Sequence, residues 1–321
     1  MNDTVKIAVC SLLMLAAPLC ASGRAADARP MTVMLDWFVN PDHAPIVVAL
    51  EKGMFEDRGL AVHIVAPSNP NDPPKMVAAG KADVAVSYQH QHHLHVDQGL
   101  PLVRIATLVA TPLNALVALE DGGVRNLSDL RGKTVGYSIG GFETVLLKVM
   151  LSGVGLGLDD IRLVNVNFSL SPSLFAGQTD AVIGAFRNFE LNQMAIEGRP
   201  GRAFYVEEYG IPPYDELIVV AHRNAIGQRH LRAFVDALEA GVQYVVNHPQ
   251  ESWRAFVKGR KELDDELNRR AWRDTLPRFA LRPGALDQNR YLRFAAFLQR
   301  QGMIGEAPPL QRWAVELPPV R

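Results

Sequence analysis

The chain has 321 residues, enough for about two domains of ordinary size. Hydrophobic residues make up 48% of it and charged residues 21%, which excludes a disordered or fibrous protein. The formal net charge of −1 gives no electrostatic basis for binding nucleic acid or an anionic membrane surface, so we expect no nucleic-acid partner.

Residues 1–26 are typical of a secretory signal peptide. Lys6 precedes the apolar run IAVCSLLMLAAPL, and small residues follow it in ASGRAA. The run is shorter than the ~20 apolar residues that a membrane-spanning helix needs. We therefore expect cleavage between Ala21 and Ala28 and a mature protein in the periplasm.

Both cysteines of the sequence, Cys10 and Cys20, lie in this leader. The mature chain is therefore expected to have neither a disulfide nor a thiol nucleophile. Cys20 could serve as a lipid-anchored first residue, but the preceding Pro18–Leu19 suits lipoprotein processing poorly. The sequence favours a free periplasmic protein over a lipid-anchored one.

From Met31 onward, short apolar runs alternate with amphipathic stretches, which is the pattern of βαβ units and mostly parallel sheets. The segments expected to form strands are 31–38, 60–67, 82–88, 103–110, 114–120, 133–138, 161–168, 180–186 and 215–222. The segments expected to form helices are 44–53, 73–80, the stretch through His95 and Asp97, 142–153, 172–177 and 187–198. From Gln228 the chain is expected to be helical or coil.

Two segments about a hundred residues apart share one plan. KMVAAGKADVAVSY and SLFAGQTDAVIGAF both have a helix, a glycine at the helix end, a turn with an aspartate and an apolar strand. This repeat predicts two similarly built lobes rather than a solenoid of short repeats. We expect the first lobe to hold 31–115 with 216–321, the second to hold 120–215, and the segments 114–120 and 215–222 to cross between them.

Ligands of open α/β sheets bind just beyond the carboxyl ends of the strands. Aromatic, amide and carboxylate side chains follow several of the predicted strands, and a glycine pair precedes the helix expected from Phe142. The candidate ligand-binding residues are Asp36, Trp37, Asn40, His43, Tyr88, Asn114, Gly140, Gly141, Glu143 and Glu190. Such a set suits a flat, polar ring that bears nitrogen, because aromatic faces stack on the ring and a carboxylate accepts bonds from its amino groups.

Two of these assignments have an alternative. Trp37 could equally be a core tryptophan, although its place between Asp36 and a proline-containing turn favours the cleft. The N–H groups of Gly140 and Gly141 could hold a carbonyl, formyl or phosphate oxygen at a helix start, but glycines also simply permit tight turns.

The run QHQHHLH, residues 89–95, is unusually rich in histidine. His92 and His95 share a helix face, as do His90 and His93, and such pairs suit a metal site. No cysteine is left in the mature chain, however, and no HExxH pattern occurs. We favour a polar helix start with one or two histidines at the cleft, and we expect no metal or other cofactor.

No GxSxG elbow or paired nucleophile and base occurs either, so we expect no catalytic residues.

An ordered series of motifs resembles the thiamine-pyrimidine family of periplasmic binding proteins. The motifs are LDWFVNPDHAP, ALEKGMFEDRGL, GKADVAVSYQ, GLPLVRIATLV, LSDLRGKTVGYS and VEEYGIPPYDEL. This family includes the transporter component for formylaminopyrimidine and hydroxymethylpyrimidine and is similar to the fungal pyrimidine-phosphate synthase. The resemblance runs from Met31 to Arg223 and more loosely beyond.

The resemblance implies a type II periplasmic-binding-protein fold, α/β in class, with two lobes and a hinged ligand cleft. It implies that Trp37 and Tyr88 frame an aminopyrimidine ring and that Glu190 bonds its amino edge. It also implies a membrane permease and an ATPase of an ABC importer as partners, and thus a transport function.

Three alternatives stay open beside this interpretation. In the fungal synthase a histidine is consumed and a cysteine-rich motif is needed. Here Gln91 stands at the position of that histidine, with His90 adjacent, and cysteines are missing, which argues against a pyrimidine-forming enzyme. A carrier of riboflavin or another heterocycle would share the framework, and Arg187 stands where relatives often carry a bulky aromatic residue. The third alternative, a periplasmic metal-binding protein, is supported by the histidines alone.

The signal peptide yields the first prediction. Protein isolated from the periplasm should begin between Ala21 and Ala28, because the apolar run after Lys6 directs export and cleavage. N-terminal sequencing and intact mass of the periplasmic fraction measure this directly. Recovery of the chain in the cytoplasm with Met1 intact would refute it.

Overall fold

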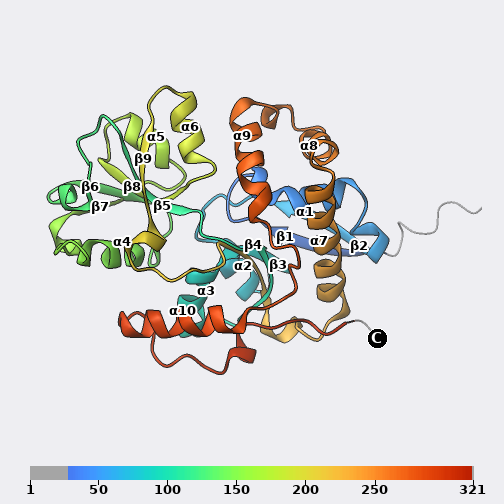
Figure 1. Ribbon diagram of the computed structural model, residues 1–321. Helices are drawn as coiled ribbons and strands as arrows, with labels where there is room; N and C mark the ends of the chain where they lie inside the picture. Colours follow the sequence, from blue (N-terminus) through green and yellow to red (C-terminus); the bar gives the residue numbers. More distant parts are fainter. Residues whose placement is uncertain (1–27, 320–321) are drawn as a thin grey trace, which may run out of the picture.

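The computed structural model describes residues 28–319 and places them in two lobes, each built on a five-stranded sheet (Figure 1). The predicted signal peptide, with Cys10 and Cys20, lies outside the described residues. Within 28–319 no helix has both the length and the apolar character that crossing a membrane requires.

The first lobe is built on the sheet β2-β1-β3-β10-β4, in which β10 runs antiparallel to both of its neighbours. Its strands are β1 (Arg29–Met34), β2 (Leu60–Val65), β3 (Val84–Tyr88), β4 (Leu102–Val109) and β10 (Leu217–His222). The helices on this side are α1 (Ala44–Glu51), α2 (Pro73–Ala78), α3 (Gln89–Asp97), α7 (Arg229–Asn247), α8 (Pro249–Val257) and α9 (Glu266–Thr275). All residues of β3 are buried, because helices cover both faces of this sheet.

The second lobe is built on the sheet β7-β6-β8-β5-β9 and repeats the same plan. Its strands are β5 (Asn114–Leu119), β6 (Thr134–Tyr137), β7 (Arg162–Asn165), β8 (Ala181–Phe186) and β9 (Gly201–Tyr205). Its helices are α4 (Glu143–Ser152), α5 (Leu170–Phe175) and α6 (Glu190–Ile196). The two similar sequence segments correspond to α2–β3 and α5–β8, which occupy equivalent places in the two sheets. The edge strand β9 was not predicted, because its short, half-exposed sequence GRAFY has no continuous apolar run.

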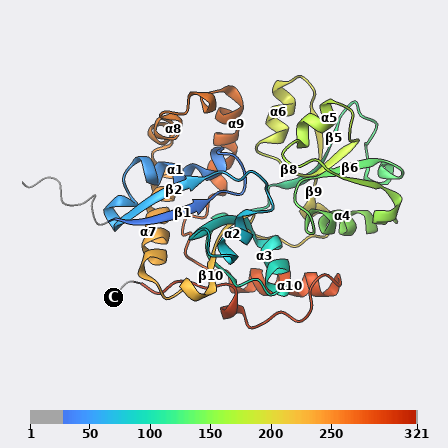
Figure 2. The ribbon, with the colours of Figure 1, turned by 180° about the vertical axis from the view of Figure 1, so that it is seen from behind.

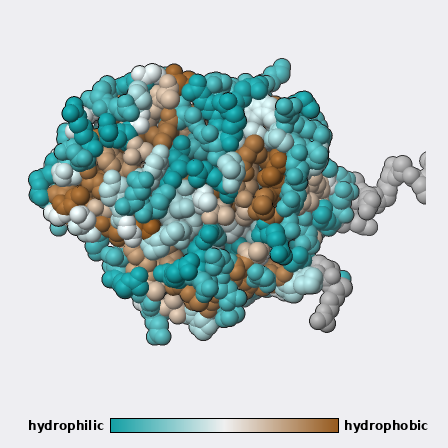
Figure 3. Space-filling model, in the orientation of Figure 1, coloured by the Kyte–Doolittle hydropathy of each residue, from teal (hydrophilic) through white to brown (hydrophobic). Residues whose placement is uncertain are grey.

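The connections between the lobes lie just before the segments expected to cross. The chain passes from β4 to β5 through 110–113 and from β9 to β10 through 206–216, whereas β5 and β10 are each strands within one sheet. The helix α10 (Gln288–Arg300), which the sequence grouped with the first lobe, places Phe294, Phe297 and Leu298 in the hydrophobic core of the second. Figure 2 shows α10 next to α3 from behind. The surface seen in Figure 3 is mostly polar, with its apolar side chains in separate patches.

The contact between α1 and α7 leaves no room for a side chain at Gly241. A Cβ there would clash with the Pro45 carbonyl oxygen and approach the Ala49 Cβ to 3.0 Å. Although alanine has the better helix propensity, we expect Gly241→Ala to lower the free energy of unfolding by about 1–3 kcal/mol, the usual cost of overpacking. Denaturant unfolding measures this. The control Gly227→Ala, with no atom within 4 Å of the added Cβ, should stay within about 0.5 kcal/mol of wild type.

Candidate ligand-binding site

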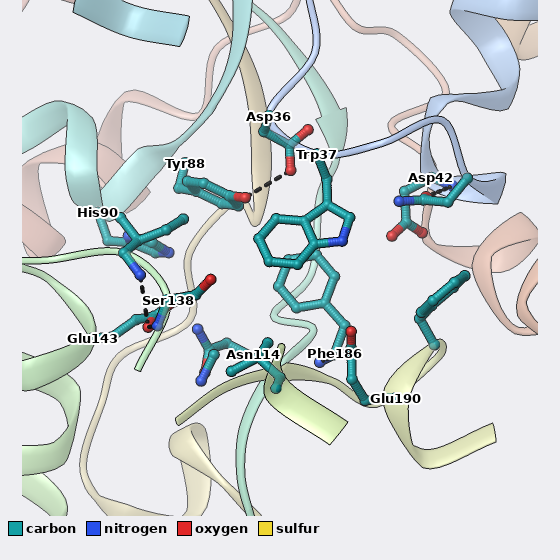
Figure 4. Close-up of a pocket in the computed structure, with 15 residues that line it drawn as sticks. Asp36, Trp37, Asp42, Tyr88, His90, Asn114, Ser138, Glu143, Phe186 and Glu190 are labelled. Atoms are coloured by element: carbon teal, nitrogen blue, oxygen red, sulfur yellow. Dashed lines mark hydrogen bonds between the residues drawn. The ribbon is translucent and has the colours of Figure 1, made fainter. Parts of the chain in front are cut away.

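A cavity lies between the two sheets (Figure 4). Side chains from both lobes line it, and they include four carboxyl groups and four aromatic rings besides His90. The fifteen lining residues are Asp36, Trp37, Asn40, Asp42, Tyr88, His90, Asn114, Ser138, Ile139, Glu143, Leu170, Gly184, Phe186, Phe189 and Glu190. None of these fifteen is a lysine or an arginine.

The sheet topology explains why residues distant in sequence meet here. The strands β1 and β3 of the first lobe and β6 and β8 of the second end at the cavity, as parallel strands of open sheets do. Asn114 instead begins β5. Because β5 runs antiparallel to β8, Asn114 pairs with Phe186 at the end of that strand and reaches the same place.

Asp36 organises the first-lobe side of the cavity. Its Oδ2 accepts a hydrogen bond from the Tyr88 hydroxyl at 2.7 Å, and its Oδ1 lies 2.8 Å from His43 Nε2. The backbone N–H of Asn40 donates to His43 Nδ1 at 3.3 Å. His43 is fully buried behind the wall, so it positions Asp36 and the turn rather than facing the cavity.

Aromatic rings form much of the remaining wall. Trp37, in the centre of Figure 4, meets the second-lobe ring of Phe168 edge-on, with 4.5 Å between the ring centroids. Tyr88 stacks on His90 at 5.3 Å with an interplanar angle of 4°. These faces allow a flat ring to bind through stacking.

Two buried glutamates occupy the starts of second-lobe helices. Glu143 Oε2 accepts the N–H groups of Ser138 at 2.7 Å and Ile139 at 3.0 Å, and Glu190 Oε2 accepts the N–H of Phe186 at 2.7 Å. Burial raises the pKa of Glu143 to about 8 and the pKa of Glu190 to about 7, because these N–H bonds only partly compensate for lost hydration. Glu190 is the first residue of α6, within the helix expected over 187–198.

Glycine is required where β8 passes Glu143. Gly184 has φ of 103°, and a Cβ on it would overlap the Glu143 carboxyl group. Its N–H donates to Asn114 Oδ1 at 3.2 Å, which orients that amide at the cavity. A glycine inside a strand signals such a close approach.

Seven of the ten sequence-predicted residues line the cavity, and three do not. Those that line it are Asp36, Trp37, Asn40, Tyr88, Asn114, Glu143 and Glu190. His43 lies behind the wall, and the glycine pair Gly140–Gly141 lies outside it. The Gly140 N–H donates to Asn71 Oδ1 of the first lobe at 3.2 Å, so the expected oxygen-binding role of the pair is not seen; the helix α4 begins after it.

Eight lining residues were missed: Asp42, His90, Ser138, Ile139, Leu170, Gly184, Phe186 and Phe189. The signal for Asp42 was present, because it lies in the same turn as Asn40 and His43. The mid-strand position of Gly184 was a second usable signal. Leu170 comes from the start of α5 and carries no sequence signal of its own.

The histidines of α3 are buried rather than gathered around a shared site. His92 Nε2 bonds the carbonyl of Trp313 at 2.7 Å, and the His93 ring lies 4.7 Å from that of Trp313. Burial lowers the pKa of His92 to about 4 and that of His93 well below its ordinary value. Within residues 28–319 no three histidine, cysteine or acidic side chains are grouped so that they could hold a metal ion. Only His90 reaches the cavity.

Two α/β lobes of this topology with a cavity between them define the fold of a two-lobed solute-binding protein, and solved structures agree. The alkanesulfonate-binding protein of Xanthomonas axonopodis pv. citri superposes with a TM-score of 0.70 at 15% identity, over 91% of this chain and 98% of that one. A Candida albicans protein described as having the generic periplasmic binding protein fold gives 0.70 at 16%, over 90% and 96%. The predicted fold class is therefore confirmed.

The chain belongs to the NMT1/THI5 like family, whose model matches residues 40–252. A Haemophilus influenzae protein named for thiamine biosynthesis is 52% identical over 89% of this chain and 92% of its own length. The formylaminopyrimidine-binding protein of Halalkalibacterium halodurans is 33% identical, over 77% of each chain. The 4-amino-5-hydroxymethyl-2-methylpyrimidine phosphate synthase of Schizosaccharomyces pombe is 24% identical, over 74% of this chain and 72% of that one. The resemblance recognised in the motifs is confirmed.

The raised pKa of Glu143 predicts a pH-dependent stability. Between the ordinary value of 4.5 and about 8, the folded protein holds a proton on Glu143 that the unfolded chain has lost, so stability falls as pH rises through this range. Glu143→Gln keeps an oxygen for the two N–H donors and removes the titration. Relative to wild type, we expect its unfolding free energy to rise by about 1 kcal/mol or more from pH 5 to pH 8.

Denaturant unfolding of the ligand-free proteins at the two pH values tests this. Glu208→Gln, at an exposed position, is the matched control and should show the same difference from wild type at both pH values. An equal shift for Glu143→Gln and Glu208→Gln would show that burial of Glu143 does not control the pH dependence.

Proposed function

We propose that this protein is an exported solute-binding protein that binds an unphosphorylated thiamine-precursor aminopyrimidine and delivers it to an ABC importer. The observation that carries the proposal is the cavity itself, with stacking faces and four carboxyl groups but no cationic side chain. The relative named formylaminopyrimidine-binding protein supports the same ligand class.

The charge of the cavity selects against anionic cargo. Asp36, Asp42, Glu143 and Glu190 all line it, while burial lowers the pKa of its only histidine, His90, so that this ring is neutral. A phosphate ester placed here would find no guanidinium or ammonium to bind it, and each carboxyl group that is ionised would repel it. A neutral or protonated nitrogen heterocycle instead supplies the donors that the carboxyl groups need.

The position of Glu190 fits recognition of an amino-bearing ring. One carboxylate oxygen accepts the N–H of Phe186, which leaves the other for the cargo. An aminopyrimidine presents an exocyclic amino group beside a ring nitrogen that can be protonated, and such donors form charge-assisted bonds with a carboxylate. Trp37 lies beside Glu190 in the cavity, where its ring face can stack on the same heterocycle (Figure 4).

Several features favour binding over synthesis of the pyrimidine. Gln91, at the position expected for the histidine of the synthases, is held by Ser87 Oγ at 3.4 Å and does not line the cavity. The only cysteines of the sequence lie in the leader, before the described residues. We propose that the protein is not an enzyme, that it works in the periplasm, and that a membrane permease with its ATPase receives the cargo.

Calorimetric titration tests this function. Wild type should bind hydroxymethylpyrimidine or its formylamino analogue, and should bind hydroxymethylpyrimidine phosphate at least about a hundredfold more weakly, because like-charge contacts cost several kcal/mol. Riboflavin provides the alternative heterocycle. If wild type ignores both pyrimidines, the ligand proposal is wrong.

Glu190→Gln tests the ring-binding carboxylate. The substitution keeps size but places a donor opposite the donors of the ring, so we expect a loss of about 2–4 kcal/mol, or about thirtyfold to a thousandfold in Kd. Trp37→Ala should weaken binding through lost stacking, without changing the preference for amino-bearing rings. The exposed Glu197→Gln at the other end of α6 is the matched control. Unchanged affinity in Glu190→Gln would show that this carboxylate does not bind the ligand.

A further inference from the structure

A buried hydrogen-bonded group joins the lobes at the Glu190 end of the cavity. Asn188 of the second lobe donates from Nδ2 to Asp42 Oδ1 at 2.6 Å and contacts Thr275 Oγ1 at 2.7 Å. The Thr275 hydroxyl lies 2.9 Å from the same Asp42 oxygen. All three side chains are at most 2% exposed. We call Asp42, Asn188 and Thr275 the clasp, because Asp42 and Thr275 lie on first-lobe elements and Asn188 on the second.

Asp42 is the one member of the clasp that also lines the cavity. Within residues 28–319 the donors next to its carboxylate, Asn188 Nδ2 and the Thr275 hydroxyl, lie at Oδ1, and no donor lies at Oδ2. The Thr275 hydroxyl is also 2.7 Å from the Ala271 carbonyl oxygen, which competes for its one proton. Figure 4 shows Asp42 on the same side of Trp37 as Glu190, away from His90 and Glu143. Burial is the main cause of the raised pKa of Glu190, and the nearby charge of Asp42 adds to it.

We propose that Asp42 couples cargo recognition to lobe closure: Oδ1, next to Thr275, accepts the cross-lobe bond from Asn188, while Oδ2 takes a hydrogen bond from an N–H group of the cargo. This inference rests on the proposed function and extends it. With the cleft closed and empty, Asp42 Oδ2 lies at the cavity without a protein donor, whereas an amino-bearing ring in the cavity can supply one. A cargo without an N–H donor for Asp42 Oδ2 leaves this oxygen unsatisfied in the closed cleft.

The electrostatics of Asp42 agree with this role. Burial raises its pKa to about 6, against the opposing effects of His43, Thr275 and Asn188. A buried carboxyl group whose charge is this poorly compensated gains more from an added donor than a solvated one does. An exocyclic amino group has two N–H donors, so Glu190 and Asp42 can each accept one.

The first test separates the clasp from the cavity. Asn188→Ala removes the cross-lobe donor without changing a residue that lines the cavity, and Thr275→Val removes the hydroxyl at similar size. Each should weaken hydroxymethylpyrimidine binding about tenfold, and small-angle scattering at equal sub-saturating cargo should show a more open average shape. The control Asn192→Ala removes a neighbouring α6–α9 bond, from Asn192 to Asp274, and a bond to the Asn188 backbone carbonyl, but it leaves the Asn188 side chain and its bond to Asp42 in place. It should stay within about threefold of wild type.

The second test addresses the cargo-facing oxygen. Wild type and Asp42→Asn are titrated with hydroxymethylpyrimidine and with the analogue in which hydrogen replaces the 4-amino group. The preference is measured as the Kd of the analogue divided by the Kd of the amino compound. This ratio should be at least tenfold larger for wild type than for Asp42→Asn. Wild-type affinity in both Asn188→Ala and Thr275→Val, or an undiminished amino preference in Asp42→Asn, would overturn the coupling while the proposed function stands. Failure of wild type to bind either pyrimidine would overturn the proposed function and this inference with it.

Discussion

Burial of carboxyl groups without a cationic partner is the constraint around which the cleft is built. Asp36, Asp42, Glu143 and Glu190 line one cavity that contains no lysine or arginine. Each must replace water with hydrogen-bond donors or hold its proton, because an uncompensated buried charge is costly. The fold supplies donors from strand ends and helix starts, which is why these residues sit where the two sheets meet.

The buried carboxyl groups differ in how many of their oxygens accept hydrogen bonds from the protein. This difference separates those with a structural role from those that can bind a ligand. Glu216, behind the cavity, accepts from the N–H of Asn114 at 2.9 Å and from the Tyr214 hydroxyl at 3.1 Å, and its other oxygen lies 3.3 Å from His90 Nε2. In the described part of the chain, Glu190 accepts the N–H of Phe186 through Oε2. An acid with both oxygens occupied holds the lobe connections in place, whereas one with a free oxygen can still accept a bond from outside.

The alternation of the sequence was sufficient to predict two α/β lobes, and the candidates chosen with the strand-end rule include seven of the fifteen residues that line the cavity. The rule succeeded for Asp36, Tyr88 and Glu190 because it depends only on strand direction. It failed for Gly140, because a free N–H at a helix start could not be distinguished from one bonded to the opposite lobe through Asn71. It also missed Leu170, whose place depends on how α5 packs rather than on a strand end.

The turn after β1 connects the first lobe to the second at the cavity. Asp36 ties this turn to Tyr88 on β3 and to His43 within it, so the segment between them has a fixed shape. From that fixed segment Trp37 reaches Phe168 and Asp42 reaches Asn188, both across the lobe boundary. The same turn therefore provides a stacking ring, a carboxylate for the cavity and a cross-lobe bond. The carboxylate and the cross-lobe bond both belong to Asp42, and Trp37 precedes it in the same turn, so this turn is where the proposed coupling of ligand binding to closure would act.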